Sequence, residues 1–418
     1  MKISAKLLAS DAQSENSGCF LPIESNISQS LSGKSVVTLD DISTAQIRML
    51  LDKARYIDSH RKEVAHTCDG RVLATLFYEP STRTRLSFET AMLRLGGKVI
   101  GFAGAQLSSA SKGETVNDTL KVVSNYVDVV AIRHPKEGAA FVATQAVSTP
   151  IINAGDGGHM HPTQTLADLA TILARFGRLN NLTVGLCGDL TYGRTVHSLI
   201  ETLCRFGNVH FVLISPDELK TPQYVIDRIN DTPSCTYEET RDLMEVIGSL
   251  DVLYMTRVQE ERFTDREQYL RLRDTYILTE EKLQKAKSYM PVLHPLPRIN
   301  EIAVDVDDDP RAAYFEQVKN GMLMRMALES SVLGDELAGY QPTDLVQVPC
   351  EESEACDANG ISLAKPRIHT ADLNAPENLE CPNPRCITNS ELTLKHKFYK
   401  SESQRHEYHC LYCDEESK

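Results

Sequence analysis

The chain lacks the features of a membrane or secreted protein. No apolar run among its 418 residues approaches the length that a transmembrane helix needs. The apolar run near the N-terminus is too short for a signal peptide, and Asp11 and Glu15 follow it closely. We therefore read residues 1–31 as a loose N-terminal extension and expect no membrane partner.

The net charge and the cysteine pattern further limit the class of protein to which this chain can belong. The formal net charge of −14 argues against a nucleic acid as the main partner, although a locally basic pocket for anionic substrates remains compatible with it. The eleven cysteines are odd in number, and only the last four lie close together. That usage fits a reducing cytoplasmic location with one metal site better than a disulfide framework.

Signatures of nucleotide binding and covalent catalysis are also missing. The glycines around Gly155 do not have the spacing of a dinucleotide fingerprint. Gly33-Lys34-Ser35 is not a phosphate-binding P-loop, because position 28 is Ser28 and no strand precedes it. Residues 1–340 contain neither a catalytic triad nor the spacing of a catalytic metal site. We expect no catalytic cofactor, and chemistry that depends on positioning and electrostatic stabilisation.

Short β-branched runs alternate with amphipathic stretches from about residue 70 onward. The expected strands are 72–77, 127–132, 183–187, 209–214 and 252–254, and the clearest helices are 85–95 and 163–176. Alternation of this kind predicts an α/β fold with two doubly wound parallel-sheet domains. Ligands are then expected at the carboxyl ends of the strands.

The chain divides into five predicted segments. After the N-terminal extension we expect one α/β domain at 32–162 and a second at 163–319. A helix at 320–337, ending near Gly339, should pack back on the first domain. Residues 341–380 contain four prolines and carry a net negative charge, and they read as a linker, whereas 381–418 read as a small cysteine-bearing β domain.

A dense cluster of hydroxyls and arginines, Ser81-Thr82-Arg83-Thr84-Arg85, follows the first predicted strand and precedes a helix. Backbone N–H groups and hydroxyls at a helix N-terminus form an anion site, and arginine adds a fixed fork of donors. A helix cap with solvated arginines is the alternative. The number of donors at one strand-to-helix turn favours phosphate binding.

Three more arginines follow predicted strands, namely Arg133, Arg194 and Arg257. Each alone could be a surface residue. As a set, they match what one phosphate-bearing substrate and one dicarboxylate substrate would require, because buried anions must be paired.

Two other segments carry candidate site residues. His161 and Gln164 flank the start of the helix at 163–176, where a histidine could polarise a carbonyl or could be purely structural. In His294-Pro295-Leu296-Pro297-Arg298 the prolines fix φ and remove donors. The carbonyls of Leu296 and Pro297 are then presented rigidly, although a loop stiffener would have the same spacing.

The C-terminal cysteines have the spacing of a metal site. Cys381 and Cys386 form C-x4-C, and Cys410 and Cys413 form C-x2-C. This pattern predicts a structural tetrathiolate zinc site, because a module of this size lacks the core to fold unaided. Four thiolates leave no open coordination position, so the zinc is expected to be structural and not catalytic.

These motifs together resemble the aspartate carbamoyltransferase catalytic chain over about residues 32–340. Ornithine carbamoyltransferases share the first motifs but typically carry a His-Cys-Leu-Pro loop, and Arg257 would not help to bind a cationic amino acid. The resemblance implies transfer of the carbamoyl group of carbamoyl phosphate to the α-amine of L-aspartate. The products are N-carbamoyl-L-aspartate and phosphate, at an early step of de novo pyrimidine (UMP) biosynthesis.

The resemblance also implies roles for individual residues. The residues that would bind carbamoyl phosphate are Ser81, Thr82, Arg83, Thr84, Ser108, Lys112, Arg133, His161, Gln164, Leu296 and Pro297. The residues that would bind aspartate are Lys112, Arg194, Arg257 and Gln259. The residues that would stabilise the tetrahedral oxyanion are Arg83, Thr84, Arg133 and His161. In the family, the loop that carries Ser108 and Lys112 completes the site of a neighbouring subunit, which implies a homotrimer or a dimer of trimers.

The C-terminal module resembles the zinc domain of the aspartate carbamoyltransferase regulatory chain. The nucleotide-binding domain that should precede it is missing, so we expect it to bridge or stabilise catalytic subunits. Two alternatives stay open at this point: a carbamoyltransferase for a different amine, and a non-enzymatic scaffold.

Overall fold

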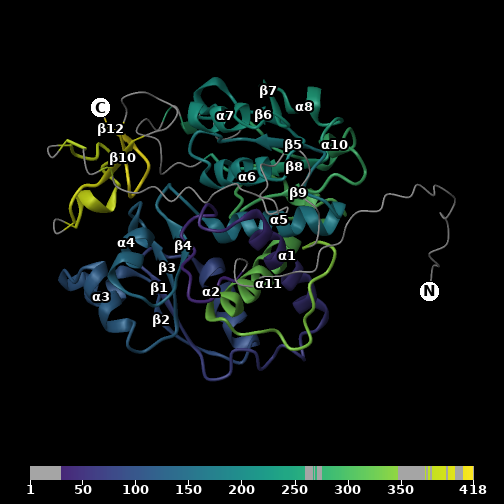
Figure 1. Ribbon diagram of the computed structural model, residues 1–418. Helices are drawn as coiled ribbons and strands as arrows, with labels where there is room; N and C mark the ends of the chain where they lie inside the picture. The colour runs from purple at the N-terminus through teal and green to yellow at the C-terminus, as the bar shows by residue number, and fades with distance from the viewer. Residues whose placement is uncertain are drawn as a thin grey trace.

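The computed structural model describes residues 30–258, 267, 269–270, 275–346, 372, 375–376, 379–391, 394–400 and 408–417. Figure 1 shows two α/β layers, one above the other, with the C-terminal module (yellow) at the left, above the outer part of the lower layer. No helix among the described residues combines the length and apolar character required to span a membrane.

The first sheet has four parallel strands in the order β2-β1-β3-β4. They are β1 (Val72–Phe77), β2 (Lys98–Phe102), β3 (Val129–His134) and β4 (Ile151–Asp156). The helices of this layer are α1 (Thr44–Ser59), α2 (Thr82–Arg94), α3 (Val116–Val123) and α4 (Ala139–Ala146).

Alternate side chains of these strands enter two different apolar clusters. Leu73 and Phe77 of β1 pack in the cluster that contains residues of α1 and α2. Ala74 and Leu76 point the other way and pack with residues of α3 and α4. Both faces of the sheet are therefore covered, which is why its central strands read as continuous apolar runs.

The second sheet has five parallel strands in the order β7-β6-β5-β8-β9. They are β5 (Leu182–Cys187), β6 (Val209–Ile214), β7 (Thr236–Thr240), β8 (Val252–Met255) and β9 (Val292–Leu293). Its helices are α6 (Arg194–Cys204), α7 (Gln223–Asn230), α8 (Leu243–Val246) and α10 (Glu280–Leu283). The same two-sided alternation recurs here, because Phe211 and Val212 of β6 enter different clusters. The predicted class of two doubly wound parallel-sheet domains is confirmed.

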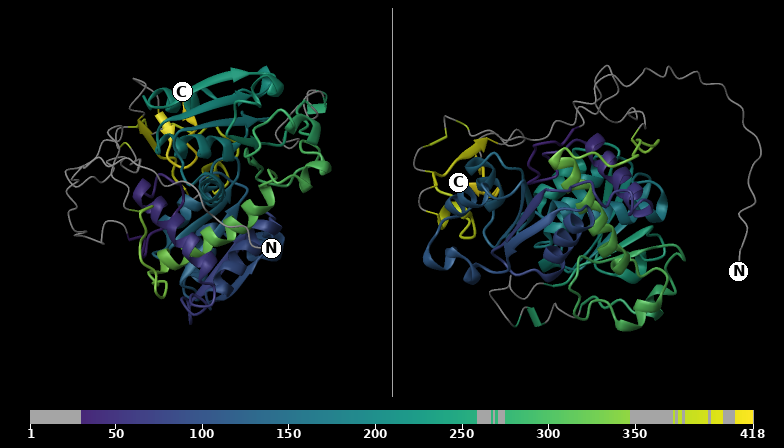
Figure 2. Two further views of the ribbon diagram at one scale, coloured as in Figure 1. Left: turned by 90° about the vertical axis from the view of Figure 1, so that its right-hand side faces the viewer. Right: turned by 90° about the horizontal axis from the view of Figure 1, so that it is seen from below.

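Two helices, α5 (Pro162–Phe176) and α11 (Tyr314–Leu333), connect the layers. They pack on one another, and α11 also packs on α1 and α2 (Figures 1 and 2). Residues of both sheets share one apolar cluster with them. The predicted helix at 320–337 was wrong at both ends. It begins earlier, and it ends where Gly334 adopts φ 75°, a left-handed cap that favours glycine.

The strands expected from apolar runs are all present, and β1 and β6 have the predicted bounds. Four strands were not anticipated. Strands β2 and β7 lie at sheet edges and are largely exposed, so their sequences are mixed rather than apolar. Strand β4 contains Asn153 and Gly155, and β9 has only two residues.

The C-terminal module contains the antiparallel strands β10 (Phe398–Lys400), β11 (Tyr408–Cys410) and β12 (Glu416–Ser417). Its apolar cluster includes Ala139 and Val142 of α4, so the module shares its core with the first layer. The expected acidic linker lies mostly outside the described residues. Its beginning is fixed to α1, because Asp52 accepts hydrogen bonds from the Thr343 hydroxyl (2.6 Å) and backbone N–H (3.0 Å).

Candidate functional site

One cleft of about 600 Å³ opens at the carboxyl ends of strands from both sheets. It brings together most of the residues that the sequence singled out. These are Ser81, Thr82, Arg83, Thr84, Arg133, His161, Gln164, Arg194, Arg257, Leu296 and Pro297.

Three predicted site residues do not line this cleft. Ser108 is half-buried and Lys112 is exposed, at the 3-10 turn Ser109–Lys112 outside the cleft. Gln259 lies outside the described residues. Within one chain the cleft therefore receives nothing from the loop that contains Ser108 and Lys112.

Three helix N-termini line the cleft, at α2, α5 and α6. Their N-cap residues, Ser81, His161 and Gly193, make no side-chain capping hydrogen bond. Because the first N–H groups of a helix have no partner within the helix, these ends favour an anion. The backbone at these three βα turns thus gives the cleft a positive potential in addition to that of its arginines.

Arg133 is held at the end of β3 by two contacts. Its Nη1 donates to the carbonyl of Ala154 at 3.2 Å, and its Nη2 lies 2.7 Å from Glu79 Oε2. Its Nε is buried and has no hydrogen-bond partner among the described residues. Burial and the neighbouring Arg133 charge lower the pKa of Arg83, which still leaves it charged near neutrality. Two guanidinium groups therefore meet beside the N-terminus of α2.

His161 is neutral at physiological pH. Burial, followed by the charges of Arg194, Arg133 and Arg325, holds its pKa well below the usual 6.5. Its Nδ1 is buried without a hydrogen-bond partner in the described part of the chain. A neutral imidazole in a cationic pocket can donate a hydrogen bond to a carbonyl oxygen without adding charge.

Asp168, one turn after Gln164 on α5, is a fully buried acceptor that joins three segments of the site. Its Oδ1 accepts from Gln164 Nε2 at 2.8 Å and from Gln317 Nε2 at 2.5 Å. Its Oδ2 accepts from the hydroxyl of Tyr254 at 3.1 Å. Burial raises the pKa of Asp168 to about 7. The three donated hydrogen bonds favour the ionised form and oppose this shift, but the effect of burial is larger.

The loop after β9 is fixed from both sides. Gln317 Oε1 accepts from the backbone N–H of His294 at 3.0 Å. The imidazole of His294 accepts from Leu296 N at 2.7 Å through Nδ1, while Nε2 lies 2.7 Å from Glu301 Oε1. Leu296 has φ 53° and is followed by a cis peptide bond to Pro297. Side-chain contacts thus hold the backbone that lines this wall of the cleft.

The turns that carry Arg194 and Arg257 are tied to each other. Thr256 Oγ1 accepts from Asp189 N at 2.8 Å, and Asp189 Oδ1 accepts from Tyr192 N at 2.9 Å. These bonds link the end of β5 to the end of β8. They bring two arginines from distant parts of the sequence to one side of the cleft.

Several cleft residues were missed from the sequence. Glu79 is the one carboxylate that lines the cleft among the described residues, and its place two residues before Ser81 could have indicated it. The buried Arg325 donates to Ser87 Oγ and to Thr163 Oγ1, both at 3.0 Å. Arg325 and Gln317 lie on α11, and nothing in their local sequence indicates that this helix reaches the cleft.

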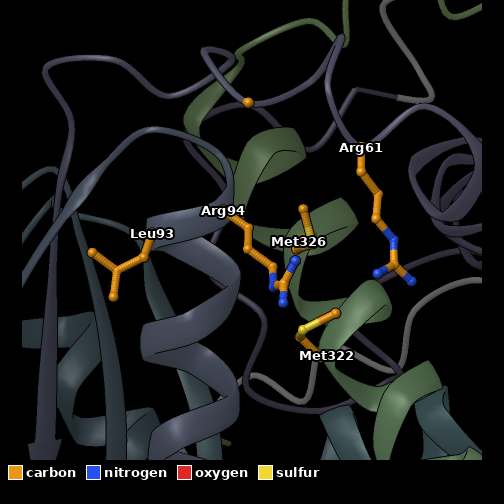
Figure 3. A pocket seen from close by; sticks show the side chains of 6 residues that line it. Arg61, Leu93, Arg94, Met322 and Met326 are labelled. Carbon is orange, nitrogen blue, oxygen red and sulfur yellow. The ribbon is translucent and has the colours of Figure 1, made fainter.

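A second hollow, of about 290 Å³, lies between α2, α11 and the segment after α1. In Figure 3 the side chains of Arg61 and Arg94 lie on either side of Met322. Arg61 is paired with Asp58. None of the residues singled out from the sequence lines this hollow.

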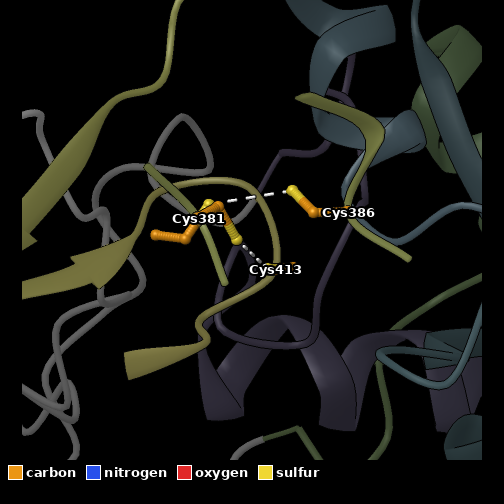
Figure 4. Close-up of side chains that lie close together, drawn as sticks. Cys381, Cys386 and Cys413 are labelled. Atoms are coloured by element: carbon orange, nitrogen blue, oxygen red, sulfur yellow. Dashed lines mark hydrogen bonds between the residues drawn. The ribbon is translucent and has the colours of Figure 1, made fainter. Parts of the chain in front are cut away.

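The four C-terminal cysteines come together in the module. Figure 4 shows three of them, Cys381, Cys386 and Cys413. All four are buried, and their sulfur atoms lie within 4.8 Å of one another. The Cys381–Cys413 and Cys386–Cys410 sulfur pairs are 3.5 and 3.8 Å apart. A tetrahedral site with metal–sulfur bonds of about 2.3 Å has sulfur–sulfur edges of roughly 3.8 Å, so the cluster has the dimensions of a metal site.

Family comparisons cover almost all of the described chain. The profile "Aspartate/ornithine carbamoyltransferase, carbamoyl-P binding domain" matches residues 34–174, and the corresponding "Asp/Orn binding domain" profile matches 180–332. The profile "Aspartate carbamoyltransferase regulatory chain, metal binding domain" matches residues 376–418.

Individual relatives agree with these profiles. The aspartate carbamoyltransferase catalytic subunit of Bifidobacterium longum is 81% identical over 316 residues, which are 76% of this chain and 99% of that relative. The catalytic subunit of Clostridium novyi is 57% identical over 306 residues, covering 73% of this chain and 100% of that relative.

Solved structures show the same likeness. The Trypanosoma cruzi aspartate transcarbamoylase in complex with carbamoyl phosphate and aspartate is 41% identical, with a TM-score of 0.69, over 72% of this chain and 98% of that one. The catalytic subunit of the M. Jannaschii enzyme is 43% identical, with a TM-score of 0.68, over 72% and 99%.

Proposed function

The chain belongs to the aspartate carbamoyltransferase family, and we propose how the residues around its cleft carry out the reaction. It transfers the carbamoyl group of carbamoyl phosphate to the α-amine of L-aspartate, an early step of de novo pyrimidine synthesis. The observation that carries the assignment of roles is the convergence of five arginines and three helix N-termini on one cleft.

The phosphate of carbamoyl phosphate binds at the N-terminus of α2. The hydroxyls of Ser81, Thr82 and Thr84 and the guanidinium of Arg83 surround this helix end. The uncapped N–H groups of α2 add donors that need no rearrangement. This position leaves the carbamoyl carbon between the end of β3 and the start of α5.

The carbamoyl group is oriented from three sides. Gln164, fixed by Asp168, faces the amide, and the carbonyls of Leu296 and Pro297 accept its N–H hydrogens. Arg133 and the neutral His161 face the carbonyl oxygen, where Arg133 Nε and His161 Nδ1 are buried atoms without partners in the described residues. Unsatisfied buried donors at this point are consistent with a ligand oxygen there.

The aspartate carboxylates bind Arg194 and Arg257, with Gln259 supporting them and Lys112 added by a neighbouring subunit. The neutral α-amine attacks the carbamoyl carbon, and a C–N bond forms. The tetrahedral oxyanion is stabilised by Arg83, Thr84, Arg133 and His161, and one such donor contributes about 3–4 kcal/mol. The C–O bond to phosphate then breaks, and the departing phosphate accepts the proton of the amine.

Ser108 and Lys112 act in the cleft of a neighbouring copy. Several large apolar residues on α2, β2 and the 3-10 turn Ala105–Leu107 are exposed in the single chain, namely Leu86, Leu93, Ile100 and Leu107. Exposed apolar groups next to a loop that lies outside its own cleft support association between copies, as a homotrimer or a dimer of trimers.

The C-terminal cluster binds one zinc ion per chain through Cys381, Cys386, Cys410 and Cys413. The sulfur spacing fits a tetrahedral tetrathiolate site, which has no open position for a substrate. The zinc is structural, and the carbamoyl transfer uses the side chains of the cleft without a catalytic cofactor.

The profiles for the two binding domains and the metal-binding domain, which match residues 34–174, 180–332 and 376–418, support the following division of the chain. Residues 32–162 bind carbamoyl phosphate, residues 163–319 bind aspartate, and 381–418 form the zinc domain, with 341–380 as the linker. The cysteines of the described residues are free thiols, which supports a cytoplasmic location.

The test is the substitution Arg83→Ala. The expected result is loss of N-carbamoyl-L-aspartate formation with an unchanged circular dichroism spectrum and melting temperature. A matched control, Arg61→Ala, removes an arginine from the second hollow and should leave turnover unchanged. Near-normal activity of Arg83→Ala would contradict the assignment. Substitution of ornithine for aspartate in the assay tests the choice of amine, and ornithine should give no product.

A further inference from the structure

The zinc module contacts the turn that precedes the catalytic histidine. We propose that the module positions His161 within its own chain. This inference rests on the role given to His161 above and goes beyond the expectation that the module bridges or stabilises catalytic subunits.

Glu137, between β3 and α4, is the first contact. Its backbone N–H donates to Arg385 O at 3.0 Å, and its carbonyl accepts from Ile387 N at 2.9 Å. Its buried carboxylate accepts from Asn383 Nδ2 at 2.5 Å through Oε2 and from Gly158 N at 3.0 Å through Oε1. One side chain therefore connects the cysteine loop of the module to the turn three residues before His161.

His159 is the second contact. Its Nε2 lies 2.8 Å from Asp414 Oδ2, directly after the last cysteine of the module, and its Nδ1 lies 3.2 Å from Asp156 Oδ2. Asp156 is almost fully buried and also accepts from Gly138 N at 2.9 Å and Met160 N at 3.0 Å. The turn at 156–160 is thus bonded to β4, to α4 and to the module at once.

The fit between the two parts is close. A Cβ at Gly138 would lie 2.5 Å from the carbonyl oxygen of Tyr412, and the Tyr412 ring meets Phe141 edge-on at 5.8 Å. Glu391 Oε1 accepts from Val116 N at 2.7 Å, at the start of α3 and just after the loop with Lys112. The module therefore contacts the turn that precedes His161 and the start of α3, which follows the loop with Lys112.

A tetrathiolate site folds only with its metal, so zinc would control this positioning. Loss of zinc should release Glu137, His159 and the turn between them, while the two α/β layers keep their own core. A displacement of catalytic groups by about 1 Å costs on the order of 100-fold in rate. We expect the zinc-stripped chain to lose about 10-fold to 100-fold in kcat.

The first experiment removes zinc from the full-length protein with a thiol-directed mercurial and a chelator. Hydrogen exchange is then followed by mass spectrometry in the peptide that covers residues 155–162. Faster exchange there, together with lower kcat and recovery of both after zinc is returned, is the expected result. Unchanged hydrogen exchange in this peptide would overturn the proposal. This holds even if activity falls, because sedimentation could then show that the loss comes from dissociation of subunits.

The second experiment keeps the zinc. Asp414 has φ 58°, so Asp414→Gly removes the carboxylate without adding backbone strain. Asn208→Gly is the matched control, because Asn208 has φ 51° and is exposed at the amino end of β6. Asp414→Gly should lower kcat about threefold or more at one zinc per chain, and Asn208→Gly should not.

A double-substitution comparison assigns the effect to one contact. If Asp414 acts through His159, then His159→Gln combined with Asp414→Gly should lower kcat no further than His159→Gln alone. Additive losses would contradict the proposed route. The variant His161→Ala distinguishes failure of the proposed function from failure of the positioning role. If His161→Ala stayed active, the catalytic role of His161 would be refuted. If Asp414→Gly and the zinc-stripped chain were both fully active, only the positioning role of the module would be refuted.

Discussion

Gly155 offers a sharp test of the cleft, because its missing side chain leaves room for Arg133. It lies at the end of β4 with φ 117°, a conformation that other residues rarely adopt. A Cβ at this position would lie 2.7 Å from Arg133 Nη1 and 3.3 Å from His161 Cδ2. Gly155→Ala should therefore displace the guanidinium from the oxyanion position.

The expected effect on activity exceeds the effect on stability. The strained φ costs about 1–3 kcal/mol of unfolding free energy. Arg133 is the flexible partner, so the clash is relieved when its side chain moves and loses the contacts to Ala154 and Glu79. Loss of one oxyanion donor lowers kcat by about 10²–10³-fold.

Steady-state kinetics and urea unfolding of Gly155→Ala measure the two effects. Gly70→Ala is the control, because Gly70 has φ 83°, is exposed, and has no atom within 4 Å of the added Cβ. It should lose stability and keep its kcat. If Gly155→Ala retained kcat within about threefold of the parent chain, the placement of Arg133 over the reacting carbonyl would be refuted.

Three further results are expected. Burial raises the pKa of Asp168 from 3.8 to about 7, so its contribution to stability is full below about pH 4 and is lost as the pH rises through 7. Asp168→Asn should reduce the fall in unfolding free energy between pH 4 and 7, and an unchanged pH dependence would contradict the raised pKa of Asp168. Inactive Lys112→Ala and Arg83→Ala chains, mixed and reassembled, should regain part of the activity if sites are shared, and should stay inactive if each chain is self-sufficient. Cys410→Ser should lower zinc content below one ion per chain in metal analysis, whereas retention of a full equivalent would exclude Cys410 as a ligand.

The candidate site was largely predictable where chemistry follows a buried strand. Arg133, Arg194 and Arg257 each follow an apolar run, and parallel strands bring their carboxyl ends to one edge. Asp168 and Arg325 were not predictable in the same way. Their positions on helices give no local sign of which group they meet, because that depends on the packing of α5 against α11.

The edge strands show a second limit. β2 and β7 were missed because edge strands are half exposed and their sequences lack apolar runs. Their existence follows from pairing with β1 and β6, which is a contact between distant segments.

The sequence by itself determined the α/β class, the strand-end arginines and the four cysteines, because periodicity, local turns and ligand spacing are short-range properties. Only the tertiary structure decided that Asp168 joins Gln164, Gln317 and Tyr254, and that the zinc module is seated on the turn before His161. These contacts join residues from distant parts of the chain. Their energy depends on how separate elements pack, which no local pattern encodes.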